Sequence, residues 1–232
     1  MEIVGHRGAC GYAPENTLKS FSRAIDMGCQ RVEMDIQVSK DRVPVIMHDE
    51  RVDRTTGGKG LVGELTLAEL KSLDAGDGER IPTLEEVIEL CRGKIALQIE
   101  LKAKNSPALV AALVERRTGS DSLVVTSFDL ALLRQFAALL PPVPLGLLNR
   151  DANLDMIATA VENRHRWICP RFDIATQPLV AAAHGSGLLV YVYHVIERRL
   201  ASQFMDWGVD AIGTDFPDLL SGASSARPHG PR

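Results

Sequence analysis

The sequence predicts a single α/β domain folded as a (β/α)8 barrel. Short apolar runs that resemble strands alternate with helix-like segments along the whole 232-residue chain. Eight such runs match the strand number of the barrel, and a chain of this length is typical of one barrel domain. A doubly wound parallel sheet is the alternative, because it shows the same alternation. The strands are expected at Ile3–His6, Val32–Ile36, Ile95–Leu101, Leu123–Ser127, Val143–Leu148, Trp167–Cys169, Leu188–Val195 and Ala211–Thr214.

Helical segments lie between these strands, as parallel crossovers require. The segment Thr83–Cys91 begins with a capping box, because Thr83 is followed three residues later by Glu86. Further helices are expected at Leu18–Met27, Ala108–Arg117, Leu130–Leu139 and Arg198–Met205.

One stretch, "VEMDIQVSKDRVPVIMHD", departs from the alternation. Its two extended runs are joined around Lys40–Arg42, a link too short for a parallel crossover, which takes about a dozen residues. The second run, Val43–His48, is therefore expected to fold back as a hairpin. A polar insertion follows at about 49–80, with a short helix near Leu67–Leu73. An insertion after the second barrel strand would lie over the barrel mouth, where lids and site walls form.

Composition limits the partners that this chain can have. Residues 1–222 are expected to form the single domain and 223–232 a flexible tail. A net charge of −4 and 5% aromatic residues argue against a nucleic-acid partner. The chain has no apolar run of membrane-spanning length and no recognisable signal peptide, so a cytoplasmic protein without stable membrane association is expected. The oligomeric state is left open. Four dispersed cysteines are expected to be reduced thiols: Cys10, Cys29, Cys91 and Cys169.

Carboxylates occur within two of the predicted strands, "RVEMDIQ" and "IALQIELK". Because side chains alternate along a strand, Glu33 and Asp35 share one face of the first, and Glu100 and Lys102 share one face of the second. Three carboxylates that converge in a half-buried space must be paired, protonated or bound to a cation. Oxygen ligands suit Mg²⁺ or Ca²⁺ better than zinc. The alternative is an ion-pair network in which Lys102 neutralises the acids.

Two histidines, His6 and His48, each end a predicted strand and are followed at once by a charged residue. A histidine titrates near neutral pH and can act as a general acid or base. Glycines on both sides of His6 and Arg7 leave space for a ligand near the backbone. Arg7 and Lys102 would add positive charge for an anion, most naturally a phosphate. The other histidines are expected to be structural or exposed: His165, His184, His194 and His229.

A series of short motifs resembles the glycerophosphodiester phosphodiesterases. The motifs occur in the family's order and extend from His6 to Pro217. The resemblance implies a (β/α)8 barrel enzyme that hydrolyses small glycerophosphodiesters, such as glycerophosphocholine or glycerophosphoethanolamine, to glycerol 3-phosphate and an alcohol. The motifs are "HRG", "PENT", "EMD", "PVIMHDE", "RTT", "IPTLEEV", "QIELK", "TSF" and "WGVDAIGTDFP".

The same resemblance implies roles for particular residues. It implies one divalent ion, Mg²⁺ or Ca²⁺ with Mn²⁺ as a further option, held by the carboxylates of Glu33, Asp35 and Glu100. It also implies that His6 and His48 form a catalytic acid–base pair. Neither the acid nor the base can be assigned, and the nucleophile is either water or the glycerol 2-hydroxyl, which would give a cyclic phosphate. The residues expected to bind substrate are Arg7 and Lys102 on the phosphate, with Glu15, Ser127 and Tyr193.

Some positions differ from the family's pattern or allow another reading. Glu15 could instead be an acid at a helix N-terminus that favours the macrodipole. Packing is an equal alternative for Ser127. Tyr193–Ile196 stands where many relatives carry Trp-Thr-Val-Asn, and Gln98 where an Asn is frequent, so the pocket for the glycerol or the alcohol group differs in shape.

Two other functions remain open. The first is an enzyme with a different reaction product, either a lysophospholipase D or a lyase that stops at a cyclic phosphate. A lipid-active enzyme would need an exposed apolar rim on the insertion, and the sequence of the insertion is mostly polar. The second is a non-catalytic barrel that only binds phosphodiesters, which is disfavoured because a competent residue fills every chemical position.

Overall fold

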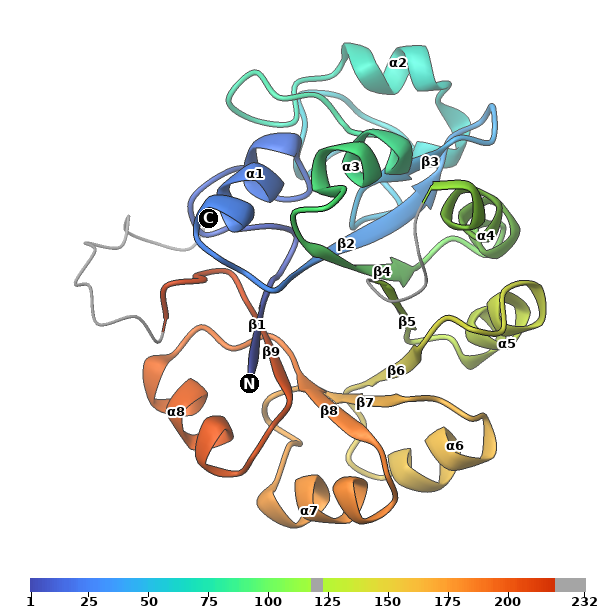
Figure 1. Ribbon diagram of the computed structural model, residues 1–232. Coiled ribbons are helices and arrows are strands. Elements are labelled where there is room, and N and C mark those ends of the chain that lie inside the picture. Colours follow the sequence, from blue (N-terminus) through green and yellow to red (C-terminus); the bar gives the residue numbers. More distant parts are fainter. Residues whose placement is uncertain (118–122, 220–232) are drawn as a thin grey trace.

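The computed structural model describes residues 1–117 and 123–219 and confirms the predicted barrel. Among these residues, nine strands form one sheet, and eight parallel ones close into a ring because β1 pairs with both β9 and β2. Figure 1 shows this ring with helices around it. The tail expected at 223–232 lies outside the described residues. The ring contains β1 (Glu2–Gly5), β2 (Arg31–Val38), β4 (Ala96–Leu101), β5 (Leu123–Ser127), β6 (Leu145–Asn149), β7 (Trp167–Pro170), β8 (Leu189–Val192) and β9 (Ala211–Thr214).

The helices follow the strands in alternation. The capping box of α3 is present, with Thr83 as the N-cap residue and Glu86 at the third helical position. No helix bounds were predicted for α6 and α7, because their short, alanine-containing segments show only a weak apolar face. No helix within 1–117 and 123–219 is long and apolar enough to cross a membrane. The helices are α1 (Leu18–Asp26), α2 (Leu67–Ser72), α3 (Leu84–Cys91), α4 (Ser106–Arg117), α5 (Leu130–Leu139), α6 (Met156–Glu162), α7 (Gln177–Gly185) and α8 (Arg198–Asp206).

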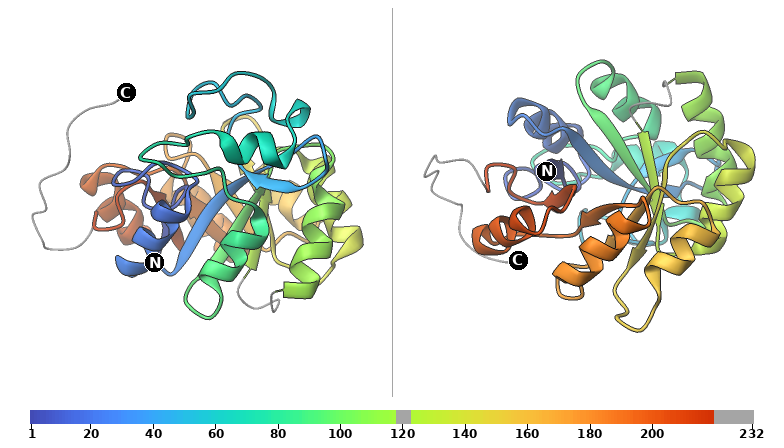
Figure 2. Two further views of the ribbon diagram at one scale, coloured as in Figure 1. Left: turned by 90° about the horizontal axis from the view of Figure 1, so that it is seen from above. Right: turned by 60° about the horizontal axis from the view of Figure 1, so that its bottom comes forward.

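The hairpin expected after the second barrel strand is present. Strand β3 (Pro44–Ile46) pairs antiparallel with the end of β2. The chain between β3 and α3 contains the 3₁₀ helix η1 (Val62–Glu64) and α2, and it extends beyond one side of the barrel (Figures 1 and 2). It is held by an apolar cluster of its own rather than left as an open loop. The cluster contains Val45, Met47, Val52, Val62, Leu70, Ala75 and Ile81.

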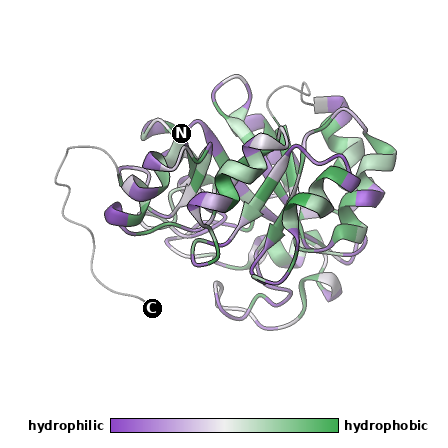
Figure 3. Cartoon of the chain, turned by 90° about the horizontal axis from the view of Figure 1, so that it is seen from below, coloured by the Kyte–Doolittle hydropathy of each residue, from purple (hydrophilic) through white to green (hydrophobic). Residues whose placement is uncertain are grey.

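The barrel interior is a packed core and not a pore. Figure 3 shows hydrophobic residues concentrated along the strands and hydrophilic residues in the connecting loops. Gly213 of β9 is required by this packing, because a Cβ atom there would lie 2.2 Å from Oη of Tyr191. In barrels of this kind, functional side chains lie at the carboxyl ends of the strands. The interior residues are Val4, Val124, Leu148, Trp167, Cys169, Tyr191 and Ala211.

Candidate active site at the carboxyl ends of the strands

Three carboxylates meet at the carboxyl ends of β2 and β4. The parallel register places Asp35 opposite Glu100, and Glu33 lies two residues earlier on the same face of β2. Ligand oxygens of the three residues lie within 4.8 Å of one another, and each residue is at most 9% exposed. Burial and the neighbouring carboxylates raise the pKa of Glu33, and burial with the charge of Asp35 raises the pKa of Glu100 to about 7. Three anions are therefore unfavourable here without a cation.

Two cationic side chains lie against the same cluster. Burial alone would raise the pKa of Asp35, but Arg7 and Lys102 lower it. Nε of Arg7 is 3.3 Å and Nζ of Lys102 is 3.4 Å from the carboxylate of Asp35. Lys102 also donates to Glu100 over 3.0 Å, and Asn16 donates to Asp35 over 2.8 Å. Lys102 thus pairs with two of the three acids, as the ion-pair alternative predicts, without excluding a metal ion beside it.

The turn that carries His6 and Arg7 has a constrained backbone. Arg7 has φ 52° and Gly8 has φ 81°, so both lie in the left-handed region. The amide of Arg7 donates to Glu33 over 2.9 Å, and its carbonyl accepts from the hydroxyl of Ser20 over 2.9 Å. A Cβ atom at Gly8 would lie 2.4 Å from that hydroxyl oxygen. The glycine is therefore needed for the turn to pack against α1, which fixes Arg7 beside the acidic cluster.

His6 is paired with an aspartate from the other end of the chain. Nδ1 of His6 lies 2.7 Å from Oδ1 of Asp215, which directly follows β9. Burial opposes the ionisation of Asp215, but the hydrogen bond and charge of His6 lower its pKa to about 2. Asp215 lies in the motif "WGVDAIGTDFP", but the sequence pattern alone predicted no role for it. Its position after the last barrel strand was the signal that could have found it.

The structure corrects the expectation for His194. Its ring stacks on that of His6 with the centroids 4.8 Å apart and the planes at 4°. Burial and the charge of His6 lower the pKa of His194. The residue follows β8 at the same end of the barrel, and therefore it belongs to the site and is neither an isolated structural residue nor an exposed one.

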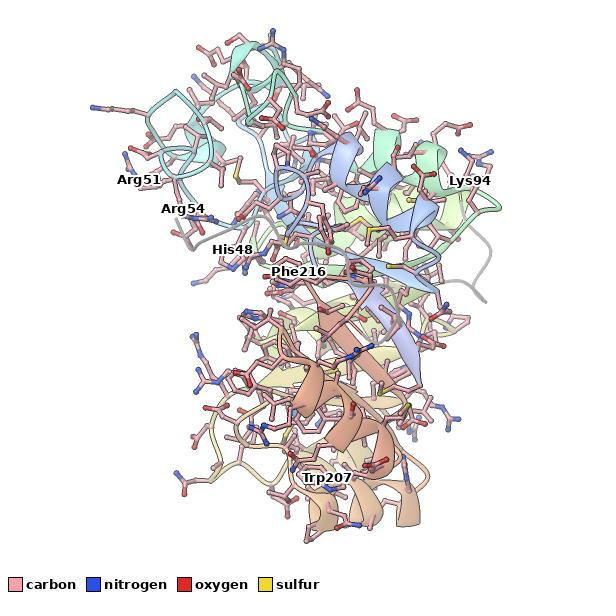
Figure 4. All side chains as sticks on the ribbon, turned by 90° about the vertical axis from the view of Figure 1, so that its left-hand side faces the viewer. His48, Arg51, Arg54, Lys94, Trp207 and Phe216 are labelled. Atoms are coloured by element: carbon pink, nitrogen blue, oxygen red, sulfur yellow. The ribbon has the colours of Figure 1, made fainter. Side chains whose placement is uncertain are left out.

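His48 has its own aspartate and a link to the insertion. Nδ1 of His48 lies 2.5 Å from Oδ1 of Asp49, whose second oxygen accepts from Arg54 over 2.7 Å. The hydrogen bond from Arg54 is the main cause that lowers the pKa of Asp49 to about 2, whereas burial lowers that of His48. Figure 4 shows His48 and Arg54 on one side of the molecule and Lys94, which precedes β4, on the other.

Glu15 joins the two parts of this network. Its carboxylate accepts two hydrogen bonds from Arg54 at 2.8 Å and one from Arg7 at 2.9 Å. Helix α1 begins after Glu15, with Thr17 as its N-cap and no acid in its first turn. The macrodipole alternative for Glu15 is therefore not the arrangement observed. Asp49 and Arg54 had no assigned role from the sequence, although Asp49 directly follows His48.

The other two expected substrate residues have different surroundings. Ser127 is 1% exposed, and its hydroxyl donates to the carbonyl of Leu101 over 2.7 Å and accepts from the amide of Asp129 over 3.0 Å. These bonds occupy the hydroxyl and fix the ends of β4 and β5. Tyr193 is half-buried; its hydroxyl donates to the carbonyl of Asn149 over 3.1 Å, and its ring meets the edge of Phe128 at 5.9 Å.

Apolar side chains follow four consecutive strands, β5 to β8. Among the described residues, half of the eight exposed large apolar side chains lie there, and the insertion 49–80 carries none of them. We call these four residues the apolar rim. Arg150 stacks on Phe128, 5.2 Å from the ring centre. The apolar rim contains Phe128, Leu154, Phe172 and Ile196.

Comparison with known proteins places the chain in a family. The model of the glycerophosphoryl diester phosphodiesterase family matches residues 6–219. The chain belongs to this family. Membership makes it a phosphoric diester hydrolase. The chain is 36% identical to the Bacillus subtilis protein YhdW, over 95% of its own length and 96% of the relative's. It is 32% identical to a glycerophosphodiester phosphodiesterase of Caldanaerobacter subterraneus, over 94% and 95% of the two chains.

Solved structures of the family have the same fold. A phosphodiesterase from Oleispira antarctica, determined in complex with the product sn-glycerol-3-phosphate, superposes with a TM-score of 0.91 at 30% identity and covers 97% of both chains. A glycerophosphodiester phosphodiesterase from Agrobacterium tumefaciens gives a TM-score of 0.85 at 29% identity, over 96% of this chain and all of its own. The barrel and its insertion are therefore family features.

Proposed function

We propose that the protein hydrolyses glycerophosphodiesters, such as glycerophosphocholine and glycerophosphoethanolamine, to glycerol 3-phosphate and an alcohol, and that a divalent metal ion is required. The observation that carries the proposal is the placing of two histidine–aspartate pairs at the end of the barrel that holds the acidic cluster. Family membership and the glycerol 3-phosphate bound by the Oleispira relative support it.

The acidic cluster fits one hard divalent ion. All three side chains, Glu33, Asp35 and Glu100, offer carboxylate oxygens, which suit Mg²⁺, Ca²⁺ or Mn²⁺. Burial and the neighbouring carboxylates raise the pKa values of Glu33 and Glu100, and the charge of a bound divalent ion would offset this effect. When bound, the ion would draw electron density from the phosphoryl oxygens.

Arg7 and Lys102 bind the phosphate in this proposal. Both lie beside Asp35 and are partly buried, with side chains 17% and 19% exposed. In a site with little water their fixed charge stabilises the negative charge that grows on the phosphoryl oxygens in the transition state. Glu15 holds Arg7 in place, so its proposed contribution to substrate binding is indirect.

His6 and His48 transfer the protons. Each has Nδ1 on an aspartate, which leaves Nε2 as the nitrogen that exchanges a proton with the reactants. One histidine removes a proton from the nucleophile and the other gives one to the leaving alkoxide. If the glycerol 2-hydroxyl is the nucleophile, a cyclic phosphate forms first, and the two histidines exchange roles when water opens it.

The apolar rim favours a second candidate function. A lipid-active enzyme was expected to carry apolar surface on the insertion, but the insertion has none of the exposed large apolar side chains of the described residues, whereas half of them lie after β5 to β8. This apolar rim, with Tyr193 in edge contact with Phe128, would suit the acyl chain of a monoacyl glycerophospholipid. Ser127 has no role in this apolar rim, since its hydroxyl is buried and already bonded.

The cytoplasmic location and the absence of a nucleic-acid partner remain predictions.

The decisive experiment is an assay of glycerol 3-phosphate release from glycerophosphocholine and glycerophosphoethanolamine. The protein is stripped with EDTA, and Mg²⁺, Ca²⁺ or Mn²⁺ is restored, for wild type and His48→Ala. We expect metal-dependent release that the substitution abolishes. Release of no product with any metal, from protein shown to be folded, would exclude the small diesters. Parallel detection of a cyclic phosphate and of choline from a monoacyl substrate identifies the other outputs.

A further inference from the structure

A second group of potential metal ligands lies beside the acidic cluster and differs from it in chemistry. A ring nitrogen of His6, Sγ of Cys10 and a carboxylate oxygen of Asp215 all lie within 4.8 Å of one another, and Nδ1 is the ring nitrogen that meets Asp215. From this grouping we propose that His6, Cys10 and Asp215 form an inhibitory site for a soft divalent ion such as Zn²⁺. The inhibition rests on the proposed role of His6, whereas the binding of the ion does not.

The backbone brings these three residues together before any ion binds. The loop after β1 lies beside the end of β9. The backbone amide of His6 donates to the carbonyl of Thr214 over 3.0 Å, and the backbone amide of Gly11 donates to the carbonyl of Asp215 over 2.9 Å. A Cβ atom at Gly11 would lie 2.4 Å from the ring of Phe216, so the two segments are in close contact. Cys10 lies between these two bonds in the chain, with its Sγ atom within 4.8 Å of a carboxylate oxygen of Asp215.

The donor set is one that zinc accepts. One imidazole nitrogen, one sulfur and one carboxylate oxygen are three of four tetrahedral ligands, with water as the fourth. Bond lengths of about 2.0–2.3 Å place such ligand atoms roughly 3.5 Å apart. The present spacing runs from 2.7 Å for the pair His6–Asp215 up to 4.8 Å, so shifts of about 1 Å by side chains suffice.

Accessibility and ligand softness separate this site from the acidic cluster. The side chains of His6 and Asp215 are 14% and 25% exposed, and Cys10 is half-buried, so an ion can enter from solvent. Mg²⁺ and Ca²⁺ avoid sulfur and would remain at the three carboxylates. Burial and Asp215 raise the pKa of Cys10, so the thiol proton must pass to solvent when the ion binds.

Binding of the ion would disable His6. A metal on Nδ1 fixes the neutral imidazole proton on Nε2, so Nε2 can no longer accept a proton from a nucleophile. The same ion also removes the carboxylate of Asp215 from its hydrogen bond with the ring. The enzyme would therefore lose turnover while the acidic cluster keeps its own ion.

The first test titrates Zn²⁺ against activity at saturating Mg²⁺, for wild type, Cys10→Ser and Cys91→Ala. Cys91 is a buried thiol at the end of α3, shortly before β4 begins and so at the opposite end of the barrel from the site, and it serves as the matched control. We expect the half-inhibitory Zn²⁺ concentration to rise by about tenfold or more in Cys10→Ser and to stay unchanged in Cys91→Ala. Equal inhibition of wild type and Cys10→Ser, or relief by added Mg²⁺, would place the zinc at the carboxylates and overturn the proposal.

The second test measures binding independently of turnover. Co²⁺ added to the Mg²⁺-loaded protein should give the near-ultraviolet charge-transfer band of a cobalt–thiolate bond in wild type and none in Cys10→Ser. Cys10→Ala replaces the serine variant if that variant does not fold. A missing band in wild type overturns the site. A band in a protein that is inactive on every diester supports the site and overturns the proposed function.

Discussion

The two halves of the barrel mouth differ in chemistry. The half built by β1, β2, β3 and β4 carries the charged network, in which side chains bond to one another from His48 through Asp49, Arg54 and Glu15 to Arg7. The half built by β5 to β8 carries the apolar rim, Arg150 stacked on Phe128, and one exposed ion pair, Arg171–Asp173, that is not linked to the network. Among the described residues, the charged side chains of the candidate site therefore come from adjacent strands whose residues pair in a fixed register, and Asp215 is added after β9.

This difference indicates that the two halves contact different parts of the substrate, the phosphoryl group and the alcohol group. Charges that act on one phosphoryl group must converge, and adjacent strands with paired residues achieve that convergence. The alcohol group of the substrate has to be accommodated rather than activated, so the opposite wall can be built from separate loops. Substitutions in the charged half should therefore reduce activity more than substitutions in the apolar rim.

The largest effect is expected from Glu33→Gln. Glutamine resembles the protonated carboxyl that burial favours and keeps an acceptor for the amide of Arg7, so the fold should persist without metal. Loss of one ligand should lower kcat/KM by roughly 10³-fold, since a bound metal contributes several kcal/mol. Steady-state kinetics and calorimetric titration with Mg²⁺ check this. Activity and metal affinity equal to wild type would remove Glu33 from the metal site.

His6→Ala should lower kcat by about 10²–10³-fold, within the usual contribution of a positioned acid or base. His194→Ala is its matched control, because it removes the stacked ring but leaves the pair His6–Asp215. We expect the control to lose less than about tenfold, since it removes only a supporting contact. Comparable losses in both variants, with both proteins folded, would contradict a distinct proton-transfer role for His6.

Asp215→Asn and Asp49→Asn should each lower kcat by roughly 10–100-fold with little change in KM, because each carboxylate orients one imidazole. Asp53→Asn is the control, since Asp53 pairs with Arg51 on the surface of the insertion. Full kinetics at several pH values separate an effect on kcat from one on binding. A loss confined to KM would count against orientation of the histidines.

Phe128→Ala probes the apolar half. Losing one exposed ring from the rim should raise KM for a monoacyl glycerophosphodiester by about 5-fold, equivalent to roughly 1 kcal/mol of apolar contact. The KM for glycerophosphocholine should not change. Leu139→Ala, an exposed apolar residue at the end of α5, is the control. Equal effects of Phe128→Ala on both substrates would assign the rim to general packing.

The smallest effect concerns stability against pH. The pKa of Asp49 is lowered to about 2 in the folded protein, chiefly by Arg54, so its contribution is complete above the unfolded value of about 4. That contribution disappears as the pH falls from about 4 to about 2. Urea unfolding of wild type and Asp49→Asn should therefore give curves that converge as the pH falls through this range. A constant gap would show that Asp49 does not titrate with folding.

The sequence predicted the parts of the site that depend on local periodicity. Alternation along two strands placed Glu33, Asp35 and Glu100 on shared faces, and the short link before Val43–His48 predicted the hairpin that carries His48. It could not place Asp215 under His6, since the two residues are 209 positions apart and meet only through barrel closure. The stacking of His194 and the apolar rim likewise depend on how loops from different strands lie together.

Closure of the barrel has a consequence for biosynthesis. Strand β1 leaves the ribosome about 200 residues before β9, yet the two pair along Glu2–Gly5 and Ala211–Thr214. A nascent chain that lacks β9 would hold the acidic cluster and both histidines, but His6 would have no aspartate behind it. Contacts between such distant segments form slowly. Synthesis of β9 and formation of the His6–Asp215 pair are therefore coupled, so the proposed proton transfer by His6 would itself report that β9 has docked.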